Sequence, residues 1–223
     1  MSMQRVLEPE LMEDAEQALA YHQADFSRAH GLRVGLYLQR FPDAQFTGPV
    51  LDLGCGSGDI LLRFARALPA ASFVGVDGAQ AMLDLAQGEL RKDAALAARI
   101  ELQRAIFPQE AIVDRPYRLI MSHSLLHQLH RPRVLWDTIL RHGRPGCRVF
   151  VADLVRPESV AAAAAIVQET SANEPEVLRR DFYNSLCAAF EADEVREQLR
   201  VAGLKGLQVE TVQPFHMLIW GTC

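Results

Sequence analysis

The chain has 223 residues, of which 49% are hydrophobic, and a formal net charge of −5 at pH 7. This length and apolar content suit a single α/β domain with a sizeable core and argue against a disordered chain. The acidic balance offers no basic surface to nucleic acid or to an anionic membrane. Neither a membrane-spanning apolar run nor a secretory signal is found, so we expect a cytoplasmic protein.

The first predicted element is a helical cap. Residues 10–41 carry apolar positions at helical spacing and show no strand pattern. They precede the first predicted strand. We therefore expect residues 1–46 to lie as a helical cap over the carboxyl edge of a sheet, where open α/β folds bind their ligands.

The most informative stretch spans residues 50–58 and reads Val-Leu-Asp-Leu-Gly-Cys-Gly-Ser-Gly. An apolar run, three alternate glycines and a periodic segment after them predict a buried strand, a tight turn and a helix. Gly54, Gly56 and Gly58 allow positive φ angles and a close approach of the backbone to a nucleotide-like ligand. A plain turn would need only one glycine.

Two acidic residues limit which kind of nucleotide-like ligand can bind at this loop. A dinucleotide fingerprint places a glycine where this chain has Asp59, whose carboxylate would repel a pyrophosphate at the start of the helix. We therefore expect a ligand without phosphate. Asp77 ends a second predicted strand at residues 72–77, the position at which an acidic side chain accepts hydrogen bonds from ribose hydroxyls.

The chain then alternates between helices and strands. The expected elements are a helix at 79–93, strands at 100–103 and 118–122, a helix at 133–141, a strand at 148–153, a helix at 192–202 and a hairpin of residues 206–212 and 216–220. This alternation predicts a parallel, doubly wound sheet. Residues 154–190 interrupt it with an Ala-rich helix and a polar stretch, and we expect this insertion to form a lid over the substrate pocket.

These motifs resemble those of class I S-adenosylmethionine-dependent methyltransferases. Residues 50–58 are similar to the first motif of that family, residues 75–83 to its second and, more loosely, residues 117–127 to its fourth. The resemblance covers most of the chain. It implies one domain over residues 1–223 with a Rossmann-like methyltransferase fold: an α/β, doubly wound, seven-stranded, mostly parallel sheet with an antiparallel last strand. It also implies S-adenosyl-L-methionine as cofactor and S-adenosylhomocysteine as product.

The resemblance implies a cofactor site at the carboxyl ends of the first strands. Its expected residues are Asp52, Gly54, Cys55, Gly56, Asp77, Gly78, Met82, Ala105, Ile106 and Ser122. Asp52 would face the ammonium group of the cofactor, and Met82 would pack on the adenine unless it only fills the core. The family commonly has an Asp after the third strand, where this chain has Arg104. We therefore expect backbone groups of Ala105 or Ile106 to contact the adenine.

Candidates for the methyl-acceptor side each have a plainer alternative. Methyl transfer from a sulfonium is an in-line displacement, and a base is needed only where the acceptor must lose a proton. His127 and Tyr183 are the catalytic candidates, although a capping or lining role explains His127 equally well. The substrate candidates are His123, Arg179, Arg180, Tyr183, Asn184, Tyr21 and Arg28. The two adjacent arginines suit a carboxylate, and surface salt bridges are their alternative.

The spacing of cysteines and histidines predicts no metal site. The four cysteines are far apart and are expected as free thiols. His123 and His127 stand at helical i, i+4 spacing, but no Glu accompanies them as it does in a zinc motif.

The sequence thus predicts a methyltransferase that acts on a small molecule and exists as a monomer or homodimer. Two alternatives stay open: an enzyme that modifies tRNA or another macromolecule with the cofactor or a derivative of it, and a cofactor-binding protein without catalysis. The acidic charge disfavours the first, and a substrate-sized cavity would argue against the second. The scaffold itself supports methylation of O, N, S or C.

Overall fold

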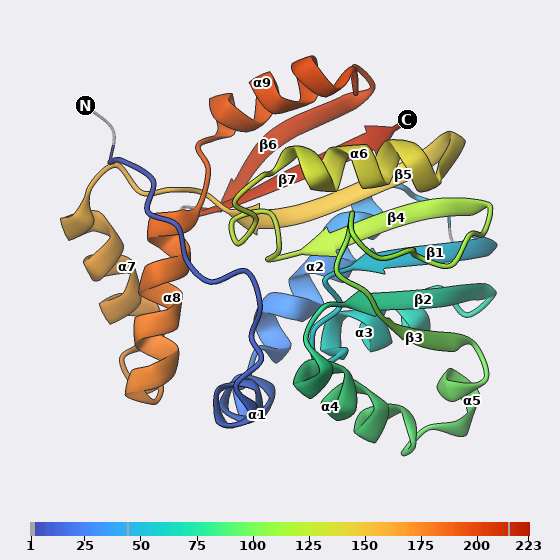
Figure 1. Ribbon diagram of the computed structural model, residues 1–223, viewed down its shortest axis with the longest axis horizontal. Coiled ribbons are helices and arrows are strands. Elements are labelled where there is room, and N and C mark those ends of the chain that lie inside the picture. Colours follow the sequence, from blue (N-terminus) through green and yellow to red (C-terminus); the bar gives the residue numbers. More distant parts are fainter. Residues whose placement is uncertain (1–2, 44, 214) are drawn as a thin grey trace.

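A seven-stranded sheet forms the centre of the computed structural model, which describes residues 3–43, 45–213 and 215–223 (Figure 1). The strands lie in the order β3-β2-β1-β4-β5-β7-β6. Their bounds are β1 Gly48–Leu53, β2 Ala71–Asp77, β3 Ile100–Arg104, β4 Tyr117–His123, β5 Gly143–Leu154, β6 Leu207–Gln213 and β7 His216–Thr222. Only β7 runs antiparallel to its neighbours. The predicted seven-stranded, mostly parallel sheet with an antiparallel last strand is confirmed.

Layers of helices cover the two faces of this sheet. The helices are α1 Ala15–Gln23, α2 Ser27–Arg40, α3 Asp59–Ala67, α4 Gln80–Leu90, α5 Ala94–Ala97, α6 Arg133–His142, α7 Val160–Ser171, α8 Glu176–Ala188 and α9 Ala192–Ala202. One buried cluster joins the sheet to α2, α3 and α4, and another joins it to α6 and α9. α1, α7 and α8 lie beyond the carboxyl ends of β1 and β4, at the left of Figure 1. Within the described residues no helix is both long and apolar enough to cross a membrane.

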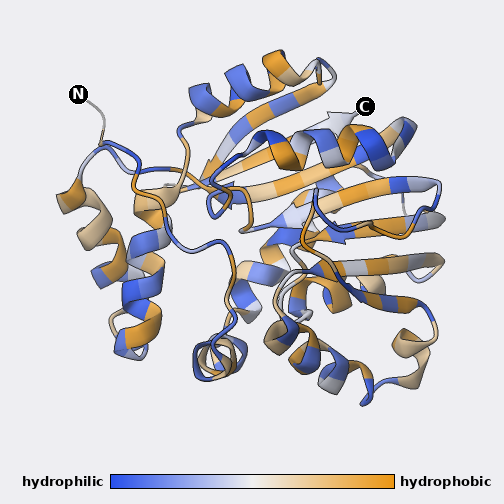
Figure 2. Ribbon diagram, in the orientation of Figure 1, coloured by the Kyte–Doolittle hydropathy of each residue, from blue (hydrophilic) through white to orange (hydrophobic). Residues whose placement is uncertain are grey.

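The central strands bury both of their faces. In β1, Val50 belongs to the cluster on one side of the sheet and Leu51 to the cluster on the other, as the two-residue period of a strand requires. Figure 2 shows hydrophobic residues along these strands and polar residues on the outer sides of the helices. The polar side chains of Asp77, His123 and Asp153 come at or beside the carboxyl ends of β2, β4 and β5. They therefore gather at one edge of the sheet.

Two differences from the expected elements concern the segments above the sheet. The helical pattern expected from residue 10 begins only at Ala15, because Asp14 caps α1 by accepting a hydrogen bond from the amide of Gln17. Residues 3–13, called the N-terminal strap below, run without a helix. The polar part of residues 154–190 forms the helix α8, which begins after Pro175. Both segments lie over the carboxyl edge of the sheet (Figure 1).

Candidate active site

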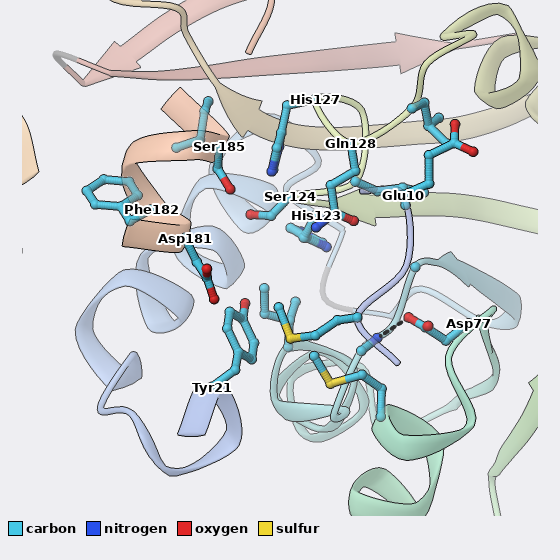
Figure 3. A pocket seen from close by; sticks show the side chains of 18 of the residues that line it. Glu10, Tyr21, Asp77, His123, Ser124, His127, Gln128, Asp181, Phe182 and Ser185 are labelled. Carbon is cyan, nitrogen blue, oxygen red and sulfur yellow. Dashed lines mark hydrogen bonds between the residues drawn. The ribbon is translucent and has the colours of Figure 1, made fainter. Parts of the chain in front are cut away.

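A cavity of about 1120 Å³ opens above the carboxyl edge of the sheet. The ends of β1, β2 and β4 contribute to its floor, and the strap, α2, α8 and the start of β7 contribute to its walls. Figure 3 shows Asp77 on one side of it and His127, Phe182 and Ser185 on the other. Such a volume slightly exceeds the usual range for small-molecule sites, so it has room for two ligands side by side.

The glycine loop between β1 and α3 exposes its backbone to this cavity. Gly54, Gly56 and Gly58 have φ angles of 74°, 54° and 86°, which side chains larger than hydrogen disfavour. A Cβ atom on Gly56 would meet nothing within 4 Å, so the space beside it is open. On Gly58 a Cβ atom would lie 3.1 Å from Ala86 of α4. The glycines thus serve both the turn and the approach of a ligand.

Asp77 holds the glycine loop in place and faces the same cavity. Its Oδ2 accepts a hydrogen bond from the amide of Gly56 at 2.8 Å, and its Oδ1 accepts one from the amide of Ala79 at 2.9 Å. Burial raises the pKa of this carboxyl despite these two donors. Each carboxylate oxygen keeps a further lone pair. A diol in the cavity is therefore a suitable partner.

The other cofactor residues expected from the sequence fall into two groups. Those that line the cavity, besides Asp77, are Gly54, Gly56, Gly78, Met82, Ala105 and Ile106. The remaining three are not among the lining residues. Ser122 donates its hydroxyl to the carbonyl of Leu53 at 2.8 Å, and the thiol of Cys55 is buried, which raises its pKa. Asp52 is buried with an unpartnered Oδ1, 4.0 Å from Nδ1 of His123.

Among the backbone groups expected to contact the adenine, the two amides already have acceptors. Ala105 donates its amide to the carbonyl of Asp77 at 3.0 Å, and Ile106 donates its amide to Oε2 of Glu110 at 2.9 Å. Glu110 also pairs with Arg104, at 3.4 Å. An adenine contact at the Ile106 amide would thus displace Glu110, which is exposed and able to move. The carbonyl groups of this loop are alternative contacts.

His127 forms the centre of a buried ionic network. Its Nδ1 lies 2.7 Å from Oδ1 of Asp153, and its Nε2 lies 3.3 Å from Oε1 of Glu8. Asp153 also accepts hydrogen bonds from the amides of Leu126 and Leu154, both at 2.8 Å. Burial alone would lower the pKa of His127, but the two carboxylates outweigh it and raise that pKa. Burial would raise the pKa of Asp153, but His127 and the two amides lower it.

The N-terminal strap brings Glu8 to this network. Arg5 anchors the strap: its Nε donates to the carbonyl of Ala188 at 2.5 Å, and its Nη2 donates to the carbonyls of His127 and Leu129. Its guanidinium also stacks on the ring of Phe190, 3.9 Å from the ring centre. The strap is thus fixed between α8 and the loop after β4.

α8 turns only one of its faces to the cavity. The lining residues are Leu178, Asp181, Phe182 and Ser185, whose spacing of three to four positions marks one side of a helix. The lid candidates from the sequence are outside this lining. Arg180 and Asn184 are exposed, and Arg180 lies 3.7 Å from Asp181. Arg179 is half-buried, and the ring of Tyr183 packs into the cluster between α7 and α8.

The remaining substrate candidates, Tyr21, Arg28 and His123, all line the cavity. Sequence reasoning did not single out several residues that line the cavity or contact His127. They are Glu8, Glu10, Arg33, Asp153, Asp181, Ser185 and His216. Asp153 had a usable signal, because it is a carboxylate at the end of an apolar strand, as Asp52 is. Glu8 had none, since its role depends on a partner distant in the sequence.

Replacing Glu8 by glutamine is expected to lower the pKa of His127. The change removes one of the two carboxylates that offset burial of the imidazole, and it keeps a side chain of the same shape beside Ser185. NMR titration of the His127 ring provides the measurement. Glu13→Gln, at an exposed position of the same strap, is the control and should leave that pKa unchanged. An equal midpoint in Glu8→Gln and wild type would contradict the contact.

The strand order, the glycine loop and the acid at the end of β2 together define the class I methyltransferase fold. Residues 50–147 match the family model described as a methyltransferase domain. The chain thus has the fold of class I S-adenosylmethionine-dependent methyltransferases, and residues 50–147 resemble their methyltransferase domain. An uncharacterized methyltransferase of Schizosaccharomyces pombe is 29% identical over 105 residues, which cover 45% of this chain. The match spans only 37% of that relative's length.

Solved structures share the fold over nearly the whole chain. One is the plantazolicin methyltransferase BpumL in complex with a pentazolic desmethyl-plantazolicin analog and S-adenosylhomocysteine (SAH). It is 13% identical to this chain, with a TM-score of 0.69, and the match covers 93% of this chain and 89% of BpumL. A methyltransferase from Aquifex aeolicus is 16% identical, with a TM-score of 0.67 and coverage of 94% and 98%. The mitomycin 7-O-methyltransferase MmcR is 18% identical, with a TM-score of 0.67 and coverage of 95% and 59%.

Proposed function

We propose that this protein transfers a methyl group from S-adenosylmethionine to a small molecule. The observation that carries the proposal is a continuous cavity that is lined by the glycine loop and Asp77 and, further along, by His123 and His127. The first part fits a nucleoside with an amino-acid tail and the second leaves room for an acceptor. The cofactor supplies a sulfonium-activated methyl group, and the chain supplies alignment and exclusion of water.

The residues at the cavity fit this cofactor. In our proposal Asp77 accepts hydrogen bonds from the ribose hydroxyls, Met82 and Ile106 pack against the adenine, and the backbone of Gly54 and Gly56 borders the methionine part. Asp52 has an unpartnered, buried oxygen near the same strand end, which suits the ammonium group directly or through water. The absence of the usual Asp after β3 leaves the adenine to backbone and apolar contacts.

His127 is the proposed base for acceptors that must lose a proton. Asp153 fixes the ring through Nδ1, so Nε2, which lies 3.3 Å from Oε1 of Glu8, is the proposed atom that exchanges a proton. Because the pKa of His127 is raised, the neutral form needed for this task is favoured at high pH. Tyr183, the other catalytic candidate, takes no part in the mechanism, because its ring packs between α7 and α8.

The segments that enclose the cavity favour a small acceptor over a macromolecule. The strap and α8 both contribute to its walls, and the chain has an acidic balance that opposes nucleic acid. The names of two similar structures, the plantazolicin and the mitomycin 7-O-methyltransferase, refer to acceptors of small-molecule or peptide kind. The cytoplasmic location and the monomeric or dimeric state stay predictions from the sequence.

Thermal unfolding with added ligands tests the proposal. SAH should raise the melting temperature, and NAD should not, because Asp59 occupies the place where a pyrophosphate would bind. At about 100 times its dissociation constant a ligand adds about 2.7 kcal/mol of stability. Stabilisation by NAD and none by SAH would overturn the assignment. If the protein binds SAH but, supplied with S-adenosylmethionine, methylates none of a broad set of small molecules, the non-catalytic alternative would be favoured.

A further inference from the structure

Arg33 is a buried cation whose charge no described residue neutralises. It lies in the middle of α2, is 5% exposed and lines the cavity. Among the described residues its guanidinium makes neither a hydrogen bond nor an ion pair, and burial lowers its pKa. Arg156, which is buried to a similar extent, is by contrast paired with Glu191 and Glu194. An unpaired buried charge is unfavourable, so the position of Arg33 points to an anionic ligand.

Two histidines with unpartnered ring nitrogens line the same cavity as Arg33. Among the described residues, neither ring nitrogen of His123 has a hydrogen-bond partner. The Nδ1 atom of His216 has none either. Burial and the nearby charge of Arg33 lower the pKa of His216 to about 3 and also lower that of His123. Both rings are therefore neutral at pH 7. Arg33 supplies the positive charge, and the histidines supply further hydrogen-bonding groups.

The position of Arg33 assigns it to the acceptor side of the cavity. The charged residue that acts on it most strongly is Asp153, in β5. Asp153 is no counter-ion for it, because its oxygens already hold His127 and two backbone amides. Asp77 ends β2, and β1 and β4 separate β2 from β5 in the sheet. The ribose expected at Asp77 is thus remote from the strand that carries Asp153.

We propose that Arg33, with His123 and His216, binds a carboxylate of the methyl acceptor. The guanidinium presents two parallel N–H donors, which match the two oxygens of a carboxylate. The inference rests on the proposed function and narrows it to acceptors that carry an anionic group. The α-carboxylate of the cofactor shares the same chemistry, and the experiment below separates the two sources.

Calorimetry on the full chain saturated with SAH tests this proposal, with benzoate and its uncharged analogue benzamide as probes. Wild type should bind benzoate at least tenfold more tightly than benzamide. Arg33→Gln should abolish that preference, and Arg33→Lys should restore part of it. Arg40→Gln, on the same helix but paired with Glu210 and outside the cavity lining, is the control and should keep the preference.

Binding of SAH and of 5′-methylthioadenosine, which lacks the amino-acid part, identifies the source of the carboxylate. In Arg33→Gln both affinities should stay within threefold of wild type, which also shows that the variant is folded. A tenfold loss for SAH alone would assign Arg33 to the cofactor and overturn the proposal. An equal affinity of wild type for benzoate and benzamide would overturn it as well. Failure of wild type to bind SAH at all would instead contradict the proposed function.

Discussion

An Asp153→Ala variant is expected to lose about 3 to 5 kcal/mol of unfolding free energy near pH 5, the cost of breaking a buried ion pair from one side. The buried imidazole of His127 would lose its nearest counter-ion, 2.7 Å away in the wild type. The amides of Leu126 and Leu154 would lose their acceptor at the same time. Urea unfolding followed by circular dichroism measures the loss. Asp137→Ala, at an exposed ion pair with Arg133, is the control and should cost less than about 1 kcal/mol.

The pKa values of the pair fix how this loss depends on pH. His127 has a raised pKa, so its contribution to stability is complete below its ordinary value of 6.5 and disappears as the pH rises through the folded value. Asp153 has a lowered pKa, so its contribution is complete above its ordinary value of 3.8 and disappears as the pH falls through the folded value. The difference between wild type and variant should be largest between about pH 4 and pH 6.5. An identical difference at pH 5 and at strongly alkaline pH would contradict an ionic pair.

Asp77→Ala should weaken the binding of SAH by about ten- to hundredfold, equivalent to ~1.5 to 3 kcal/mol. The variant removes the proposed acceptor of the ribose hydroxyls and also frees the amide of Gly56, which belongs to the glycine loop. Loss of the hydrogen bonds to Gly56 and Ala79 should in addition lower the unfolding free energy by about 1 to 3 kcal/mol. Calorimetric titration with SAH gives the affinity, and urea unfolding gives the stability.

A nearby aspartate separates the binding effect from a general loss of charge. Asp84 lies on α4 and accepts a hydrogen bond from Gln80 at the surface. Asp84→Ala should bind SAH as the wild type does. If folded Asp77→Ala also retains wild-type affinity, Asp77 is not part of the cofactor site and the ribose must be bound elsewhere.

The part of the cavity proposed for the cofactor was predictable because its signals are local in the sequence. The strand, the glycines and the following helix are contiguous, and Asp77 follows one βα unit later. Each of these residues has its position set by neighbours within the same unit, as the hydrogen bond from Gly56 to Asp77 illustrates. The parallel sheet followed from the same alternation of strands and helices.

The part of the cavity proposed for the acceptor was predictable only in part, because remote segments form it. The contact of Glu8 with His127 depends on the path of the strap, which no periodicity encodes. On α8 the rotation of the helix about its axis decides which side chains face the cavity, since successive residues are about 100° apart. Composition favoured Arg179 and Arg180, whereas the face toward the cavity carries Asp181 and Phe182.

The placement of β7 between β5 and β6 has a consequence for the order in which the molecule can form during translation. β6 leaves the ribosome before β7, yet its hydrogen-bonding partner in the sheet is β7. β6 therefore has no native pairing partner until residues 216–222 have been synthesised. The start of β7 also brings His216 to the cavity wall. A nascent chain can thus complete the glycine loop early, while the pocket for the second reactant is finished only after the last strand has been inserted.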